Sequence, residues 1–375
     1  MILTIVTFVI ILAILIFVHE FGHFIVAKKS GMAVEEFGFG FPPRLAGIQK
    51  VDGRRKLVWG HRQPLDKDQT VYSINWIPLG GFVRIRGEDN EHEDDSRSFI
   101  NRPFGARLLT LVAGVVMNFL LAWVLLSIGL VVGLPVAVDS PSSLPAHARL
   151  NNPQVAIMQV VPGQPAAKAG VQEGDILLQV DQKSFSKSDD LSSYILGHAG
   201  QVIQFEVKRG GQLLQFEVQS NAHPGPDQGP TGISLSNIGV MTFPWYLAPY
   251  EGLKTTFVEI GNIASGLWQL VTGQVSVSNL GGPVKIAQLT GEVSRMGFIY
   301  LLQFTAFLSV NLAILNILPF PALDGGRVLF LVIEKFRGKR NNQKVEQWVN
   351  TVGFMLLLLL MFLVTTHDIL NIFHK

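Results

Sequence analysis

The sequence predicts a polytopic α-helical membrane protein with about four transmembrane helices, into which a small α+β domain is inserted. Three observations predict this class. Hydrophobic residues make up 48% of the 375 residues and charged residues only 15%, whereas an ordinary soluble domain has roughly 25% charged residues. Four long apolar segments are spread along the sequence. Between the second and the third lies a stretch of short β-rich runs separated by turn residues.

The first apolar segment is expected to form a transmembrane helix over 1–27. Residues 1–18 contain no charged side chain. An uncharged apolar stretch of this length is long enough for a membrane span. A secretory signal peptide would carry basic residues before the apolar run and a cleavage site of small residues after it. Here Lys28 and Lys29 follow the run instead, so we expect a retained helix.

Three further spans are expected from the same criterion of length and apolarity. They cover 108–134, 298–334 and 347–368, and the second of these three is interrupted by prolines. Lys and Arg are frequent in 28–107 and in the loop EKFRGKRNNQK before the last span. By the positive-inside rule these parts are cytoplasmic, and both termini and the long segment after the second span lie outside.

The segment 237–297 is expected to be an extracytoplasmic or interfacial linker. Within it, 263–283 is weakly apolar and is a candidate for a fifth membrane element. Its many small and polar residues favour an external or interfacial position. The rest of the composition limits the partners: the net charge of +2 gives no reason to expect nucleic acid, and the absence of cysteine excludes thiolate metal sites.

The segment 153–236 has the pattern of a small α+β domain. Its β-rich runs are separated by Gly, Pro and Asp, and DDLSSYILGHA between them predicts one short helix. The β-rich runs are QVAIMQVV, DILLQVDQ, QVIQFEVKR, QLLQFEVQ and GPTGISLS.

Within this segment, VPGQPAAKAGVQEGD resembles the core of a circularly permuted bacterial PDZ domain. In that arrangement the peptide-binding loop and strand come last, which places them at 229–236, with Gly232 and Ile233 as candidate contacts. PDZ domains hold a peptide or the C-terminus of a protein by adding a strand at a sheet edge. A small β module without a ligand remains the alternative.

The motif HEFGH ends the first apolar segment. His19 and His23 are four residues apart and project from one face of a helix, so that they can bind one metal ion. Glu20 lies beside them and is suited to take a proton from an activated water. Histidines and a glutamate at membrane depth are costly, which favours a functional site over a helix cap at the interface.

A third metal ligand is expected at Asp324. Catalytic zinc usually takes three protein ligands and keeps a fourth position open. Asp324 follows the prolines of the third span and is surrounded by apolar sequence. With four spans, His19 and Asp324 both arrive at the cytoplasmic side of the bilayer and can meet, whereas a fifth span would separate them.

Taken together, the motifs resemble the site-2 protease family of intramembrane zinc metalloproteases, and within it the bacterial RseP-like group, here with a single PDZ domain. HEFGH is paired with NILPFPALDGG, and GVVMN in the second span is similar to the G-x-x-x-N element. YSINWIPLGGFVRIRGED is similar to the membrane-associated β-hairpin of bacterial members, here expected at about 70–86. SNLGGPVKIAQLTGEV is similar to their G-P-V-G-I segment, with Lys285 at a position where glycine is usual.

This resemblance implies an endopeptidase of the bacterial cytoplasmic membrane that holds one Zn²⁺ per molecule. Its active site would lie near the cytoplasmic side and the PDZ domain outside. Its substrates would be single-span membrane proteins, such as anti-sigma factors, or signal-peptide remnants. The alternatives are a catalytically inactive PDZ adaptor tethered to the membrane, and an HExxH metalloprotease acting on cytosolic or misfolded membrane proteins.

Several residues are candidate substrate contacts. A helical substrate must unwind before its peptide bond is accessible, and the hairpin could hold it extended by strand addition; a hairpin that only packs on the membrane is the alternative. Asn316 and Asn118 are polar residues inside spans, where they could contact the extended substrate or the surroundings of the zinc site. Hydrogen bonding between helices is the alternative. The candidates are Asn316, Asn118, Ile74, Gly80 and Gly81.

Overall fold

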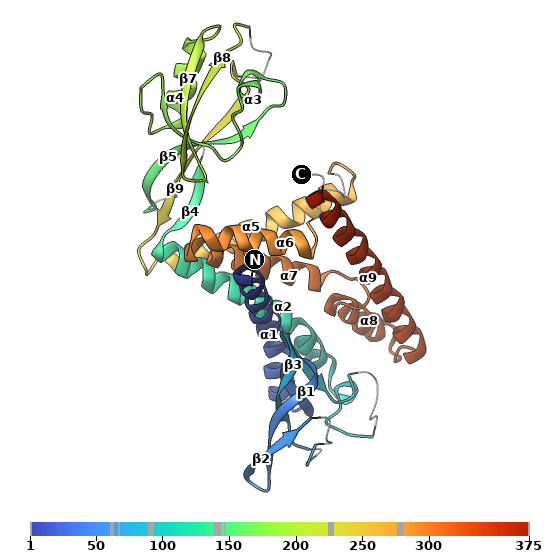
Figure 1. Cartoon of the computed structure of the whole chain (residues 1–375). Helices are drawn as coiled ribbons and strands as arrows, with labels where there is room; N and C mark the ends of the chain where they lie inside the picture. Colours follow the sequence, from blue (N-terminus) through green and yellow to red (C-terminus); the bar gives the residue numbers. More distant parts are fainter. Residues whose placement is uncertain are drawn as a thin grey trace. The chain divides into compact units, whose positions relative to one another are not determined.

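The structure is a computed structural model that describes residues 2–60, 64–66, 68–88, 94–138, 144–145, 147–223, 229–275 and 281–373. The protein divides into two compact units (Figure 1). The first combines residues 1–127 with 250–375, and the second, which we call the PDZ-like unit, consists of residues 128–249.

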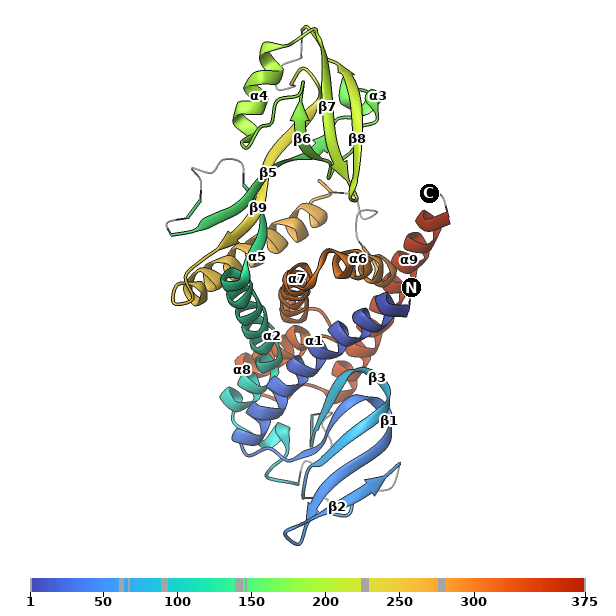
Figure 2. The ribbon, with the colours of Figure 1, turned by 60° about the vertical axis from the view of Figure 1, so that its left-hand side comes forward.

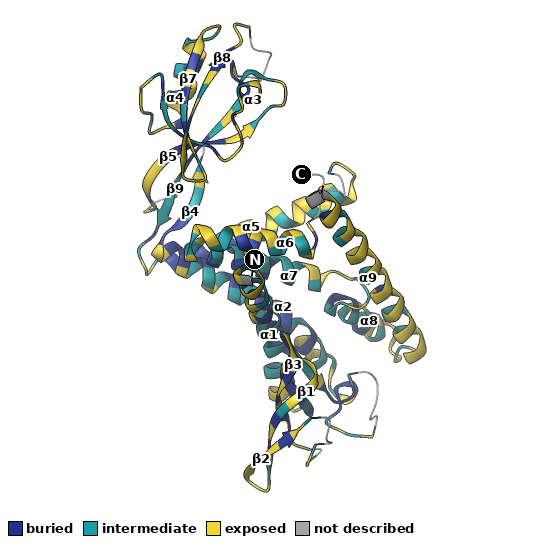
Figure 3. Ribbon diagram, viewed as in Figure 1, coloured by how far each residue is buried: buried dark blue, intermediate teal, exposed yellow. Residues whose placement is uncertain are grey.

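Four helices of the described residues are long and apolar enough to cross a membrane, as the sequence predicts. They are α1 (Ile2–Lys29), α2 (Phe104–Val132), α7 (Phe298–Ile317) and α9 (Gln343–Phe373). Along α9 most side chains, among them Leu356, Leu359 and Phe362, are exposed (Figure 3). An exposed row of large apolar side chains is what a lipid-facing helix presents.

The helix bounds differ from the expected ones at two spans. α2 ends at Val132, because Gly133 turns the backbone with φ of +124° and Leu134 already begins a strand. The expected single span 298–334 is wrong, since α7 stops at Ile317 and a separate helix, α8 (Asp324–Arg337), follows the prolines. Pro319 and Pro321 have no backbone N–H to donate, so they cannot continue the helix. The backbone turns after α7, and Asp324 becomes the first residue of α8.

The expected hairpin at 70–86 is also wrong. This segment is one long strand, β3 (Val71–Ile85), and its partner is β1 (Val34–Val51), which in turn pairs with β2 (Arg54–Trp59). Figure 2 shows this three-stranded sheet beside α1. Its exposed side chains include Phe39, Phe41, Leu57, Trp59, Ile74 and Trp76. An exposed apolar surface of this kind suits contact with a membrane or another protein.

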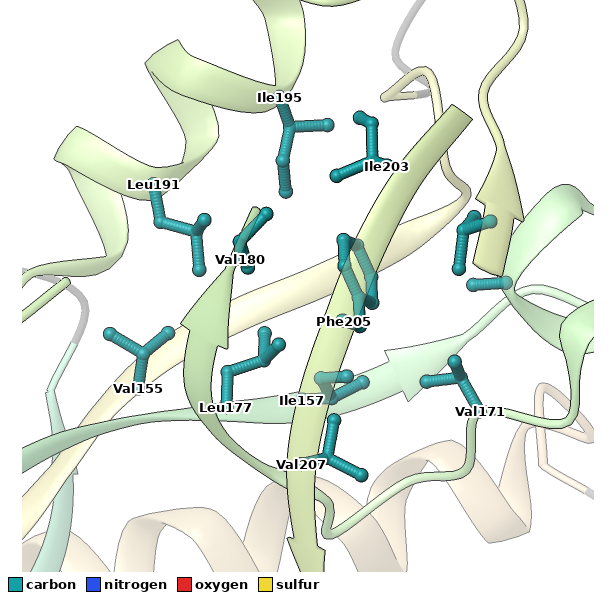
Figure 4. Packing of buried hydrophobic residues seen from close by; sticks show 12 residues of the cluster. Val155, Ile157, Val171, Leu177, Val180, Leu191, Ile195, Ile203, Phe205 and Val207 are labelled. Carbon is teal, nitrogen blue, oxygen red and sulfur yellow. The ribbon is translucent and has the colours of Figure 1, made fainter. Parts of the chain in front are cut away.

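The PDZ-like unit contains a six-stranded sheet in the order β4-β9-β5-β6-β7-β8, together with α3 (Pro165–Ala169) and α4 (Ser188–Gly197). The strands are β4 (Leu134–Val138), β5 (Arg149–Val160), β6 (Ile176–Val180), β7 (Val202–Arg209), β8 (Gln212–Gln219) and β9 (Ile233–Thr242). The sheet therefore extends beyond the expected bounds 153–236 at both ends. Alternate residues of its strands form the core in Figure 4, including Val155, Ile157, Leu177, Ile203, Phe205 and Val207.

The expected linker 237–297 is largely helical after β9. It contains α5 (Ala248–Val271) and α6 (Pro283–Met296). Neither helix is among the four that are apolar enough to cross a membrane within the described residues. Part of the weakly apolar stretch 263–283, namely 276–280, lies outside the described residues. A short 3-10 helix, η1 (Phe99–Asn101), precedes α2.

Candidate metal centre

Three side chains from opposite ends of the sequence meet in the first unit. The Nε2 atoms of His19 and His23 are 3.2 Å apart. Asp324 Oδ2 lies 2.9 Å from His19 Nε2 and 3.4 Å from His23 Nε2. Both histidines are buried. Among the described residues, this is the group of histidine and acidic side chains that could hold a metal ion.

The sequence of α1 and α8 explains how these side chains meet. His19 and His23 are one helical turn apart on α1, while Asp324 opens α8 directly after the turn made by Pro319 and Pro321. A Cβ atom at Gly325 would lie 2.2 Å from the carbonyl oxygen of Leu318. Only glycine therefore allows the turn to fold back onto the first turn of α8.

Helix α2 packs against the same face of α1 through glycines. A Cβ at Gly22 would lie 2.4 Å from the Ala113 carbonyl oxygen, and one at Gly114 would lie 2.4 Å from His23 Nε2. The Gly114 Cβ would also lie within 2.7 Å of His19 Nε2. The absence of a side chain at Gly114 thus makes room for the two imidazoles.

Both histidines are held through their second ring nitrogen by α2. His23 Nδ1 is 2.7 Å from the carbonyl oxygen of Thr110. His19 Nδ1 is 3.2 Å from the side-chain amide of Asn118, which is fully buried. Ser309 on α7 donates its hydroxyl hydrogen to the Asn118 carbonyl oxygen at 2.8 Å. Hydrogen bonds of this kind orient metal-binding imidazoles.

The three donor atoms fit a zinc ion. Ligand bonds of 2.0–2.2 Å in a tetrahedral site place the donor atoms about 3.3–3.6 Å apart. The distances of 2.9, 3.2 and 3.4 Å between the three donor atoms are close to this range. Two imidazoles and one carboxylate are a ligand set that zinc accepts in catalytic sites, with a fourth position left for water or substrate.

Glu20 interacts electrostatically with His19, His23 and Asp324 but is not one of the donor residues. Its Oε2 accepts a hydrogen bond of 3.1 Å from the backbone N–H of Val83 in β3. In the sheet, Val83 pairs with Phe37 of β1, and among the described strands the stretch 81–85 of β3 has a neighbour on this side only. The edge of β3 is therefore beside the carboxylate of Glu20.

The other predicted substrate contacts lie elsewhere. Asn118 bonds to His19 and is fully buried, which places it beside the metal centre. Asn316 is half-buried in the last turn of α7. Gly80 and Gly81 pack closely on α1, where a Cβ at Gly80 would lie 2.5 Å from Ile16.

Ile74 is exposed, but its stretch of β3 has neighbours on both sides. Its pairing partners are Phe39 and Ala46 of β1. A substrate strand cannot add to the backbone there. The available edge is at the other end of β3, at 81–85, which pairs with the first residues of β1 alone among the described strands.

In the PDZ-like unit, Gly232 and Ile233 stand at the start of β9. Gly232 has φ of +71°, and Ile233 pairs with Val160 of β5. Strand β4 pairs with the later part of β9, from Asn237 onwards. Among the described strands, residues 233–236 thus pair on one side only, next to α4, which leaves an edge where a short peptide can add.

Two parts of the site were not predicted from the sequence. Thr110 acts through its backbone carbonyl, which any residue type offers, so no sequence pattern indicates it. The contact of Val83 with Glu20 depends on the long strand β3, which was expected to be a hairpin.

Comparison with known proteins shows the family. The profile of Peptidase family M50 matches residues 7–59 and 60–360. A protein of Clostridium perfringens, provisionally named a zinc metalloprotease, is 36% identical, and the match covers 95% of both proteins. The zinc metalloprotease RasP of Geobacillus kaustophilus is 30% identical, covering 99% of this protein and 98% of the relative.

The regulator of sigma-W protease RasP of Bacillus subtilis is 30% identical, and the match covers 99% of both proteins. Among solved structures, the PDZ domain of an SdrC-like protein from Listeria monocytogenes has 25% sequence identity and a TM-score of 0.20, covering 22% of this protein and 85% of that domain. The profile match extends from α1 to α9 and includes both halves of the metal centre. The chain belongs to Peptidase family M50.

Proposed function

We propose that this peptidase is a membrane-embedded zinc endopeptidase that cleaves single-span membrane proteins. The observation that carries the proposal is the meeting of His19, His23 and Asp324 beside the carboxylate of Glu20. The names of its relatives, zinc metalloprotease and regulator of sigma-W protease, support the same activity. Substrates of the anti-sigma-factor type and signal-peptide remnants are the classes we expect.

His19, His23 and Asp324 would hold one zinc ion per molecule. A bound zinc ion supplies a Lewis acid that acidifies water and polarises a carbonyl oxygen. Glu20 accepts a proton from the attacking water and passes it to the leaving amide nitrogen. Because Val83 N–H donates to Oε2, the carboxylate stays oriented and its other oxygen is free to accept that proton.

We propose that the edge of β3 at 81–85 binds the substrate in extended form. A transmembrane helix hides its peptide bonds in internal hydrogen bonds, so it must unwind before hydrolysis. Strand addition at an open edge replaces these bonds with intermolecular ones. The position of Val83 beside Glu20 supports this edge, since a peptide at this edge would lie along the catalytic carboxylate while the Val83 N–H stays bonded to Glu20.

We place the enzyme in a bacterial cytoplasmic membrane, with the active site near the cytoplasmic face. Lys28 and Lys29 in the last turn of α1 support this orientation, since they follow HEFGH closely. The PDZ-like unit is then extracytoplasmic, and its edge at 233–236 is suited to a peptide or to the C-terminus of another protein.

Removal of the metal tests the proposed function. We expect the wild-type protein in liposomes to cleave a single-span substrate. A chelator should stop cleavage and added zinc should restore it, because the ion held by His19, His23 and Asp324 would activate the water. Product would be measured by gel and the cut site by mass spectrometry. Cleavage that survives complete removal of zinc would contradict the proposal.

Cysteine crosslinking tests the substrate edge. The protein has no cysteine of its own, so Arg84→Cys, at an exposed position of the β3 edge, provides a single thiol. In an inactive Glu20→Gln background we expect a disulfide with cysteines placed in the unwound part of the substrate. Lys56→Cys on β2, at the opposite end of the strand order, is the matched control. Equal crosslinking at both positions would exclude strand addition at β3.

A further inference from the structure

We infer that Asn118 is a positioning residue for the metal centre: its side-chain oxygen accepts the Nδ1 proton of His19 and so keeps Nε2 free to bind the ion. This inference rests on the proposed function and assigns Asn118 a role other than substrate contact. It starts from the different ways in which α2 holds the two histidines.

His23 shows what a metal-binding imidazole requires. A backbone carbonyl can only accept a hydrogen bond, so the contact with Thr110 places the His23 proton on Nδ1. Its Nε2 therefore carries a lone pair that points toward Asp324 and His19. In this tautomer His23 is ready to bind a metal ion without losing a proton.

His19 needs the same tautomer, and within the described part of the protein the side chain of Asn118 is the group at its Nδ1 that can select it. With the amide nitrogen facing His19 Nδ1 at 3.2 Å, the nitrogen would donate. His19 would then carry its proton on Nε2, which lies 2.9 Å from Asp324 Oδ2 and could not bind the ion. In this amide orientation the Asn118 oxygen is buried and has no hydrogen-bond partner among the described residues.

A half-turn of the amide reverses both roles. The oxygen and nitrogen of an asparagine amide are assigned from the hydrogen-bond network. With the oxygen toward His19, it accepts the proton on Nδ1, and the Nε2 lone pair becomes available to the ion. The unpartnered oxygen thereby gains a donor. Asn118 then serves His19 as the Thr110 carbonyl serves His23, and its backbone is held in place by Ser309.

Zinc affinity of two substitutions at this position tests the inference. Asn118→Leu keeps similar volume but cannot accept a proton, and we expect its zinc affinity to fall about 10–100-fold, as for other lost partners of metal-binding histidines. Asn118→Asp can only accept, and we expect it to retain zinc and to give a wild-type visible spectrum with cobalt. Affinity would be measured on the purified full-length protein by competition with a chromophoric chelator.

The matched control is Ser127→Ala, which removes a hydroxyl from the same helix without affecting the site, since Ser127 bonds to the Trp123 carbonyl. Wild-type zinc affinity in Asn118→Leu would overturn the inference and leave the proposed function standing. Equal losses in Asn118→Leu and Asn118→Asp would also overturn it, because acceptance of a proton would then not matter. A wild-type protein that binds no zinc would overturn the proposed function itself.

Discussion

Replacing Glu20 with glutamine will stop peptide hydrolysis while the metal centre stays intact. Glutamine has nearly the same shape and can still accept the hydrogen bond from Val83 N–H through its amide oxygen. It cannot accept a proton from water at neutral pH, and loss of general-base assistance costs about 10²–10⁴-fold in rate. Glu20 is not one of the donor atoms, so zinc binding should remain.

Cleavage of a reconstituted single-span substrate and zinc content per molecule would be measured on the same preparations. His23→Ala provides the contrast, because it removes a donor atom and should lose both zinc and activity. Glu251→Gln is the matched control, since this glutamate pairs with Lys254 on α5, outside the metal centre. If Glu20→Gln cleaves at the wild-type rate, or loses its zinc as His23→Ala does, Glu20 is not the base we propose.

The sequence was sufficient to propose the three candidate metal ligands that the structure brings together. The spacing of His19 and His23 depends only on the geometry of one helix. Asp324 could be paired with them because a third ligand was needed and because its predicted depth in the membrane matches theirs. The structure brings these three residues together over about three hundred positions of sequence. Four apolar spans were also predictable, since length and apolarity are properties of one segment.

The sheet beside α1 was not predictable in the same way. Strand β1 contains Gly38, Gly40 and two consecutive prolines, which interrupt the alternation that indicates a strand. Its pairing with β3 joins residues far apart in sequence, so that the expected hairpin had no local evidence against it. The position of the proposed substrate edge beside Glu20 follows only from this pairing.

The sequence leaves the role of Asn118 open between substrate contact, the surroundings of the metal site and hydrogen bonding between helices, because burial and partners decide it. The sequence alone does not show whether a polar residue within a span faces a substrate, another helix or a metal ligand. Its contact with His19 depends on how closely α2 approaches α1. That close approach depends in turn on the absence of a side chain at Gly22 and Gly114. A glycine in a sequence does not indicate by itself that two helices pack closely.

Substitution of Gly114 with alanine will therefore remove the metal centre by a single methyl group. The new Cβ would lie 2.4 Å from His23 Nε2 and 2.7 Å from His19 Nε2, far inside van der Waals contact. Either the imidazoles or α2 must move, and a shift of about 1 Å in a catalytic group costs about 10²-fold in rate. We expect zinc affinity and cleavage to fall together.

Gly105→Ala is the matched control on the same helix, because a Cβ there meets nothing within 4 Å. Alanine is the better helix former by about 1 kcal/mol, so neither substitution should weaken α2 itself. If zinc affinity and cleavage fall only in Gly114→Ala, the cause is the collision of the new methyl group with the two histidines. If Gly114→Ala binds zinc as tightly as Gly105→Ala, the prediction is wrong. Helix α2 would then lie farther from His19 and His23 than the structure places it.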